Sequence, residues 1–267
     1  MPSTINNKPP QQCRWHGYAT AAELEQAAAV AILHAAQQAI RQRGAFHIVL
    51  AGGTTPRQVY ELLRASNADW ASWHVYFGDE RCLPSDHAER NSRMAAMAWL
   101  DHVLIPARQI HPIPAEMGAE TAASIYAQTV GGIELFDLVL LGLGEDGHTA
   151  SLFPDHEWGI SPDAPAAIAV HDALKPPPER VSLSAHRLSA AHQVMFLVTG
   201  SAKQQAVRNW RSGAAIPAAA IIPANGVDVY LEATLLGSQV GETFCRSGPC
   251  VCCWGFSPLQ PRRTPCG

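Results

Sequence analysis

The sequence predicts an α/β fold, with a doubly wound, largely parallel sheet and helices on both faces in a Rossmann-like three-layer architecture. Short apolar runs alternate along the chain with stretches that suit helices. The runs are apolar at nearly every position, as in strands that are buried on both faces. Hydrophobic residues make up 47% of the 267 residues and charged residues only 16%, so the chain can fill one large core.

Capping and glycine signals define the first predicted helix. Thr20 and Glu23 form a capping-box pattern, which predicts that the helix begins after Thr20. Gly44 follows the last residues of helical spacing and suits the left-handed position that ends a helix. The apolar run 46–51 comes next and predicts a buried strand.

A glycine turn and a second predicted helix follow this strand. Thr55 can cap the helix, and Pro56 suits its first position. Residues 173–180 contain three consecutive prolines, which predicts a stiff extended loop. The same alternation predicts further strands at 73–77, 136–141, 193–198 and 227–231 and further helices near 91–100, 117–130 and 201–211.

Both ends of the chain differ from the predicted α/β domain, which we place at residues 15–237. Residues 1–14 are polar, so we expect a flexible segment without the apolar stretch of a secretory signal. Residues 238–267 hold five of the seven cysteines, but their spacing lacks the pairs of a zinc ribbon. We therefore expect an aberrant Cys/Pro-rich tail outside the fold, no bound metal and a cytoplasmic protein.

Charge and hydropathy limit the possible partners. The formal net charge of −4 gives no basic surface for nucleic acid. Apolar stretches fall short of the ~20 residues that span a bilayer, so we expect no membrane partner. A small-molecule ligand is the remaining expectation, bound by a monomer or a small homo-oligomer.

Several predicted strand ends carry groups suited to an anion. Ligands of open α/β sheets bind beyond the carboxyl ends of the strands. The Gly52-Gly53-Thr54-Thr55 turn offers backbone N–H groups and a helix N-terminus, although an ordinary capped turn is the alternative. Asp79 and Arg81 follow another strand, and an arginine can hold a phosphate in bidentate fashion. Arg180 and Lys203 add positive charges, and together these groups could form a phosphate and oxyanion pocket.

The strand at 136–141 leads into a turn that carries a histidine. Gly142, Gly144 and Gly147 match a dinucleotide fingerprint, but Pro154 interrupts the long helix that should follow. The turn instead places Asp146 beside His148, so that a carboxylate can orient a general base. The sequence contains no Gly-x-Ser-x-Gly elbow and no His-Glu-x-x-His motif, which disfavours a serine nucleophile and a zinc centre.

Taken together, five motifs resemble the 6-phosphogluconolactonases, within the larger glucosamine-6-phosphate isomerase/deaminase-like superfamily. The resemblance covers roughly residues 15–237, and the His-Thr-Ala-Ser-Leu-Phe-Pro string is its most specific part. The motifs are Ala51–Pro56, Phe77–Pro84 with Asn91 and Ser92, Gly142–Pro154, Lys175–Ser182 and Gly200–Lys203.

The resemblance implies metal-independent hydrolysis of 6-phosphoglucono-1,5-lactone to 6-phosphogluconate in the oxidative pentose phosphate pathway, without a cofactor. The position that matches His148 is the family's general base for water. Positions that match Arg81, Arg180 and Lys203 are its cationic substrate contacts. The segment 229–237 fits the family's C-terminal pattern only in part.

Two other functions compete with the lactonase interpretation. The glucosamine-6-phosphate isomerase/deaminases have an acidic residue five positions after the histidine, where this sequence has Phe153. A non-catalytic sugar-phosphate sensor would lack a use for His148, and we see no DNA-binding segment before the domain. Both observations favour the lactonase.

Overall fold

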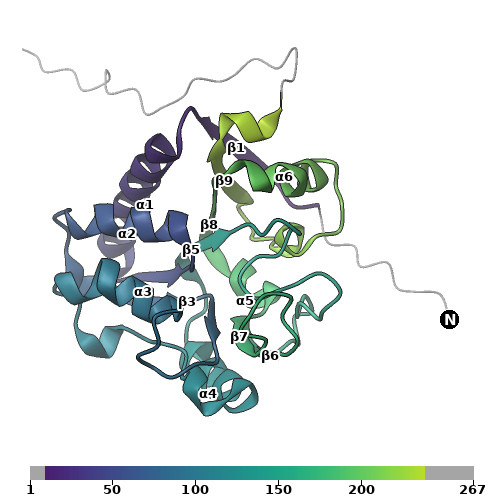
Figure 1. Cartoon of the computed structure of the whole chain (residues 1–267). Coiled ribbons are helices and arrows are strands. Elements are labelled where there is room, and N and C mark those ends of the chain that lie inside the picture. The colour runs from purple at the N-terminus through teal and green to yellow at the C-terminus, as the bar shows by residue number, and fades with distance from the viewer. Residues whose placement is uncertain (1–9, 238–267) are drawn as a thin grey trace, which may run out of the picture. The chain divides into compact units, whose positions relative to one another are not determined.

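The computed structural model describes residues 10–237, and the predicted tail at 238–267 lies outside these residues. Its centre is a six-stranded sheet in the order β1-β9-β8-β5-β2-β3 (Figure 1). All neighbouring strands in this sheet run parallel, which confirms the predicted fold class. The strands are β1 (Cys13–Tyr18), β2 (Phe46–Leu50), β3 (Trp73–Phe77), β5 (Phe136–Gly142), β8 (Ala191–Val198) and β9 (Val227–Glu232).

Helices cover both faces of this sheet. Figure 1 shows α1, α2 and α3 together on one side and α5 and α6 on the other. None of the helices within residues 10–237 has the length and apolar character needed to cross a membrane. The helices are α1 (Ala21–Arg43), α2 (Thr54–Arg64), α3 (Asn91–Ala98), α4 (Ala119–Gly131), α5 (Ala185–Ser189) and α6 (Gln204–Arg211).

The predicted ends of α1 are confirmed. The Thr20 hydroxyl accepts a hydrogen bond from the backbone N–H of Glu23 at 3.2 Å, and the Glu23 carboxylate accepts one from Ala19 at 3.1 Å. Gly44 ends the helix in the left-handed conformation, with φ 81°.

Two boundaries near the start of the domain differ from prediction. Strand β1 already begins at Cys13, inside the segment that we expected to be flexible, because Cys13 and Arg14 pair with β9. The prediction that Thr55 caps α2 is wrong. Gly53 is the N-cap and gives no side-chain hydrogen bond, whereas the Thr55 hydroxyl lies 2.6 Å from that of Thr199.

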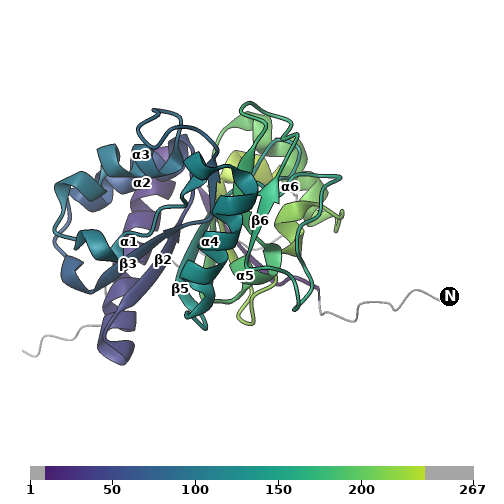
Figure 2. The same cartoon turned by 90° about the horizontal axis from the view of Figure 1, so that it is seen from below.

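A second, antiparallel sheet was not predicted. Its order is β4-β7-β6, with β4 at Asp79–Arg81, β7 at Arg180–Leu183 and β6 at Ala167–Val170. The sheet joins the end of β3, since the backbone N–H of Leu183 donates to the carbonyl of Gly78 at 2.8 Å. Helix α4 packs against β6 and β7 (Figure 2). This sheet pairs residues 79–81 with residues 180–182, which lie about 100 positions later in the sequence.

Three histidines form a stack on the β2 and β3 side of the large sheet. The rings of His47 and His74 lie 4.7 Å apart, and those of His74 and His111 lie 5.9 Å apart, with near-parallel planes in both cases. Burial, followed by repulsion between the rings, lowers the pKa of His47 and His111 below 6.5. Burial and the positive charge of Arg108 lower the pKa of His74 in the same direction.

Candidate active site

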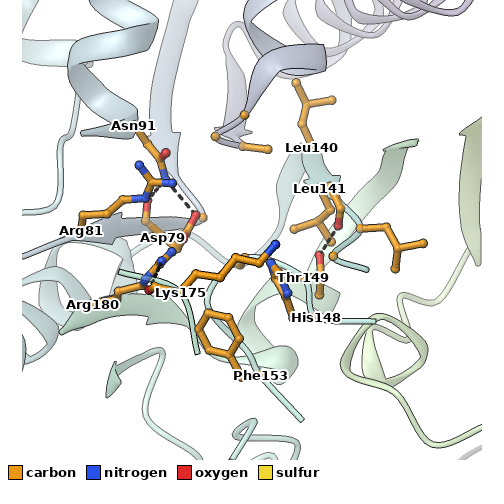
Figure 3. Close-up of a pocket in the computed structure, with 18 of the residues that line it drawn as sticks. Asp79, Arg81, Asn91, Leu140, Leu141, His148, Thr149, Phe153, Lys175 and Arg180 are labelled. Carbon is orange, nitrogen blue, oxygen red and sulfur yellow. Dashed lines mark hydrogen bonds between the residues drawn. The ribbon is translucent and has the colours of Figure 1, made fainter. Parts of the chain in front are cut away.

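A cavity of about 310 Å³ opens at the carboxyl ends of β2, β3 and β5 (Figure 3). After β2 the chain continues to β3 on one side, and after β5 it continues to β8 and β9 on the other. The cavity therefore lies at the switch point where open α/β sheets bind ligands. Seven of the predicted site residues line it, namely Gly52, Gly53, Asp79, Arg81, His148, Arg180 and Lys203.

The predicted pairing of His148 with Asp146 is present. Nδ1 of His148 lies 2.5 Å from Oδ1 of Asp146, and the same oxygen accepts the backbone N–H of His148 at 3.1 Å. A carboxylate at this distance assigns the proton to Nδ1, which leaves Nε2 as the basic nitrogen. Asp146 itself lies behind the histidine and outside the cavity wall.

Electrostatics keep the imidazole of His148 neutral near pH 7. Burial lowers the pKa of His148 below 6.5, and the positive charge of Lys175 acts in the same direction, although Asp146 opposes both. Burial would raise the pKa of Asp146, but hydrogen bonds from His148 hold it below its usual value. The pair is thus a neutral imidazole on an ionised carboxylate, which is the form required of a general base.

Gly144 leaves the space that this pair occupies. A Cβ atom at position 144 would lie 2.0 Å from Nδ1 of His148 and 2.5 Å from Oδ1 of Asp146. Any other residue would displace one of the two side chains. The glycine in the turn therefore serves the histidine and not the pyrophosphate of a dinucleotide.

Asp79 is a buried carboxylate in the opposite wall. It accepts hydrogen bonds from the Ser151 hydroxyl at 2.5 Å and from the Asn91 side-chain amide at 3.0 Å. Gly52 permits the position of Asn91, because a Cβ atom at position 52 would lie 2.0 Å from its Oδ1. Asn91 lines the cavity but was not among the predicted site residues, although it belongs to one of the five motifs of the family resemblance.

Glu80 holds in place the part of the wall that carries Arg81 and Asn91. Its fully buried carboxylate accepts the backbone N–H groups of Arg81, Asn91 and Ser92 at 2.7 to 2.9 Å. It also lies 3.4 Å from Nε of the buried Arg90. Glu80 therefore joins β4 to the N-terminus of α3, the two elements that carry Arg81 and Asn91.

Three cationic side chains have donors available to a ligand. Arg81 lines the cavity and donates only from Nη1, to the carbonyl of Glu89, which leaves its Nη2 without a partner within residues 10–237. Burial lowers the pKa of Lys203, which lines the cavity with Lys175. Sequence reasoning missed Lys175 as a site residue, because an exposed lysine in a proline loop carries no local signal of its destination.

The last two predicted site residues do not reach the cavity. Thr54 and Thr55 lie on the first turn of α2, outside the cavity wall. Of this turn, Gly52 and Gly53 line the cavity, and the Thr55 hydroxyl lies 2.6 Å from that of Thr199.

Comparison with known proteins agrees with this geometry. Residues 19–230 match the family described as glucosamine-6-phosphate isomerases/6-phosphogluconolactonase. The chain belongs to this family. The resemblance inferred from the five motifs is therefore confirmed. A solved glucosamine-6-phosphate deaminase, described as monomeric, has 19% identity and a TM-score of 0.71, and so shares the family's fold.

Relatives within the family carry the lactonase name. A 6-phosphogluconolactonase of Synechocystis sp. is 40% identical over 184 residues, which are 64% of this chain and 73% of the relative. One of Mycobacterium leprae is 37% identical over 213 residues, or 74% of this chain and 84% of the relative. The structure of the Trypanosoma brucei 6-phosphogluconolactonase has 26% identity and a TM-score of 0.76, covering 84% of this chain and 98% of that one.

Proposed function

We propose that this protein is a metal-independent 6-phosphogluconolactonase, which hydrolyses 6-phospho-D-glucono-1,5-lactone to 6-phosphogluconate in the oxidative pentose phosphate pathway. The observation that carries the proposal is a neutral histidine, held by a carboxylate, in the wall of a cavity that also contains several cations. The lactonase names of relatives at 37–40% identity support it.

His148 would act as the general base for water. Nε2 takes a proton as the water oxygen attacks the lactone carbonyl carbon, and Asp146 stabilises the imidazolium that forms. The tetrahedral oxyanion then collapses, the bond from the carbonyl carbon to the ring oxygen breaks, and the imidazolium returns its proton to that oxygen. The product is an open-chain hydroxy acid, and the histidine is again neutral.

The cationic and the anionic side chains of the cavity would bind different parts of the substrate. Arg81, Lys175 and Lys203 supply positive charge for the phosphate and the oxyanion, and the N–H groups at the N-terminus of α2 add a partial positive charge behind Gly53. Asp79 is suited to accept hydrogen bonds from the sugar hydroxyls, because its carboxylate is buried at the cavity.

The deaminase alternative is less well supported by the site. Phe153 is fully buried, and its ring centroid lies 4.8 Å from that of His148. An apolar ring therefore occupies the position at which the deaminases are expected to carry an acidic side chain.

The test is hydrolysis of freshly generated lactone, coupled to oxidation of 6-phosphogluconate, in the presence of EDTA and after subtraction of spontaneous hydrolysis. We expect rapid turnover by the native chain and about 10²–10⁴-fold slower turnover by His148→Ala, the range of general-base contributions. Absence of turnover by folded protein would refute the proposal, and so would release of ammonia from glucosamine 6-phosphate at a comparable rate.

We also propose a cytoplasmic location. The described residues contain two cysteines, Cys13 and Cys82, and both are unpaired, as is usual in a reducing compartment. Fractionation of the source cells would test this, and recovery of the protein outside the cytoplasm would contradict it.

A further inference from the structure

We infer that Arg180 is a positioning residue, which holds the loop of Lys175 at the cavity and does not itself bind the substrate's phosphate. The inference rests on the proposed function and assigns different tasks to two arginines that the sequence alone could not distinguish. It changes the role that the family resemblance implied for Arg180.

Three of the five donor hydrogens of Arg180, those on Nε and Nη2, are used by backbone carbonyls, and only the two on Nη1 have no partner within residues 10–237. Nε donates to the carbonyl of Pro177 at 3.2 Å, and Nη2 donates to those of Lys175 at 2.8 Å and Pro176 at 3.3 Å. Nε carries one hydrogen and Nη2 carries two, so this edge of the guanidinium is fully occupied. A guanidinium binds phosphate most strongly through two donors on one edge. Because Nε and Nη2 of Arg180 bind three consecutive residues of its own loop, this edge is not free to bind a phosphate.

Arg81 lies directly opposite Arg180 in the antiparallel sheet. Two like charges at such a position destabilise a sheet unless other groups compensate. After burial, Arg81 is the positive charge that contributes most to lowering the pKa of Arg180. Carbonyls occupy Nε and Nη2 of Arg180, whereas Arg81 gives only Nη1 to a carbonyl, that of Glu89, and its Nη2 has no partner within residues 10–237. Of the opposed pair, Arg81 is thus the residue suited to an anion.

The three hydrogen bonds from Arg180 to the carbonyls of residues 175–177, which we call the clamp, determine where the Lys175 ammonium lies. In Figure 3 the Lys175 side chain extends from the side of Arg180 across Phe153 towards His148. It makes no hydrogen bond or ion pair with other described residues, so only its backbone holds it there. The Arg180 guanidinium also lies 5.5 Å from the centroid of Phe153, the ring that packs against His148. Loss of the clamp should therefore move Lys175 away from the general base.

A double-mutant cycle tests this coupling through kcat/KM for the lactone. Arg180→Ala and Lys175→Ala should each reduce kcat/KM by about tenfold or more. The kcat/KM of the double variant should match that of the less active single variant to within about twofold. Arg180→Lys keeps the positive charge but loses the planar set of guanidinium donors, so its kcat/KM should resemble that of Arg180→Ala. Losses that multiply in the double variant, or rescue by Arg180→Lys, would show that Arg180 contacts the substrate independently and would overturn the inference.

Two further readouts separate the clamp from a general loss of structure. Amide hydrogen exchange at Ala173, whose N–H donates to the carbonyl of Pro178 at 3.0 Å within this loop, should accelerate in Arg180→Ala and remain unchanged in Lys175→Ala. The acidic limb of the pH profile of kcat/KM should move to higher pH in both variants, because the positive charge of Lys175 lowers the pKa of His148. Unchanged exchange in Arg180→Ala would overturn the clamp. The exchange result needs no activity, so it decides the clamp even if the native chain does not hydrolyse the lactone.

Discussion

Asp146→Asn removes the charge behind the general base but keeps its size, and we predict a lower kcat with little change in KM. The substitution replaces a carboxylate 2.5 Å from Nδ1 of His148 by a neutral amide. Two effects follow. The imidazolium that forms during the reaction loses its counter-charge, and the amide can present an N–H group to Nδ1, which favours the tautomer with a proton on Nε2.

The size of the effect can be estimated from the contact. Hydrogen bonds to charged groups contribute about 1.5–3 kcal/mol to stability. The side chains of His148 and Asp146 are 18% and 31% exposed, so solvent weakens the interaction and we use about 2 kcal/mol. At about 1.4 kcal/mol for each tenfold change, kcat should fall by about 30-fold, and more if the wrong tautomer dominates.

The coupled lactone assay measures this loss, and the pH dependence of kcat/KM supplies a second criterion. Asp146 raises the pKa of His148, so its replacement should move the acidic limb to lower pH. Glu145→Gln removes an adjacent negative charge that has no contact with the imidazole and serves as the matched control. If Asp146→Asn turned over as fast as Glu145→Gln, or if its acidic limb moved to higher pH, Asp146 would not be the group that orients the base.

Three further predictions concern the cavity and the histidine stack. Arg81→Ala should raise KM for the phosphorylated lactone about tenfold or more but leave unphosphorylated gluconolactone unaffected; equal losses with both substrates would exclude a phosphate contact. Gly144→Ala should retain the circular dichroism of the native chain yet reduce kcat about tenfold or more, since the added Cβ would lie 2.0 Å from Nδ1 of His148, and full activity would contradict this. The free energy of unfolding in urea should fall as the pH drops below about 6.5. In this range the histidines of the unfolded chain bind protons, whereas the stacked histidines of the folded chain, whose pKa is lowered, stay neutral. His74→Gln should reduce this slope and the exposed His34→Gln should not; equal slopes in all three proteins would contradict it.

The sequence was most informative where signals are local. Apolar runs located five strands of the large sheet to within a few residues, because such strands are buried on both faces. Strand β1 was missed, since it is a partly exposed edge strand whose pairing with β9 spans more than 200 residues. Strand β4 consists of three charged residues, which local criteria assign to a turn.

In the site, too, only relations between residues close in sequence could be predicted. His148 and Asp146 could be related to one another because they lie two positions apart, whereas the space that Gly144 leaves for them became clear only from the structure. The separate tasks of Arg81 and Arg180 could not be deduced, since they depend on carbonyls in a proline loop and on a strand register that only the folded chain creates. Lys175 was overlooked for the same reason.

The cavity wall is assembled from chain segments that are far apart in sequence, from Leu50 to Lys203, and this couples ligand affinity to the global stability of the fold. A sugar phosphate that bridges these segments has no comparable site on the unfolded chain. Thermodynamic linkage then adds about 2.7 kcal/mol to the free energy of unfolding when the ligand is present at one hundred times its Kd. Metabolite concentration would in this way set the folded fraction of the enzyme as well as its rate of turnover.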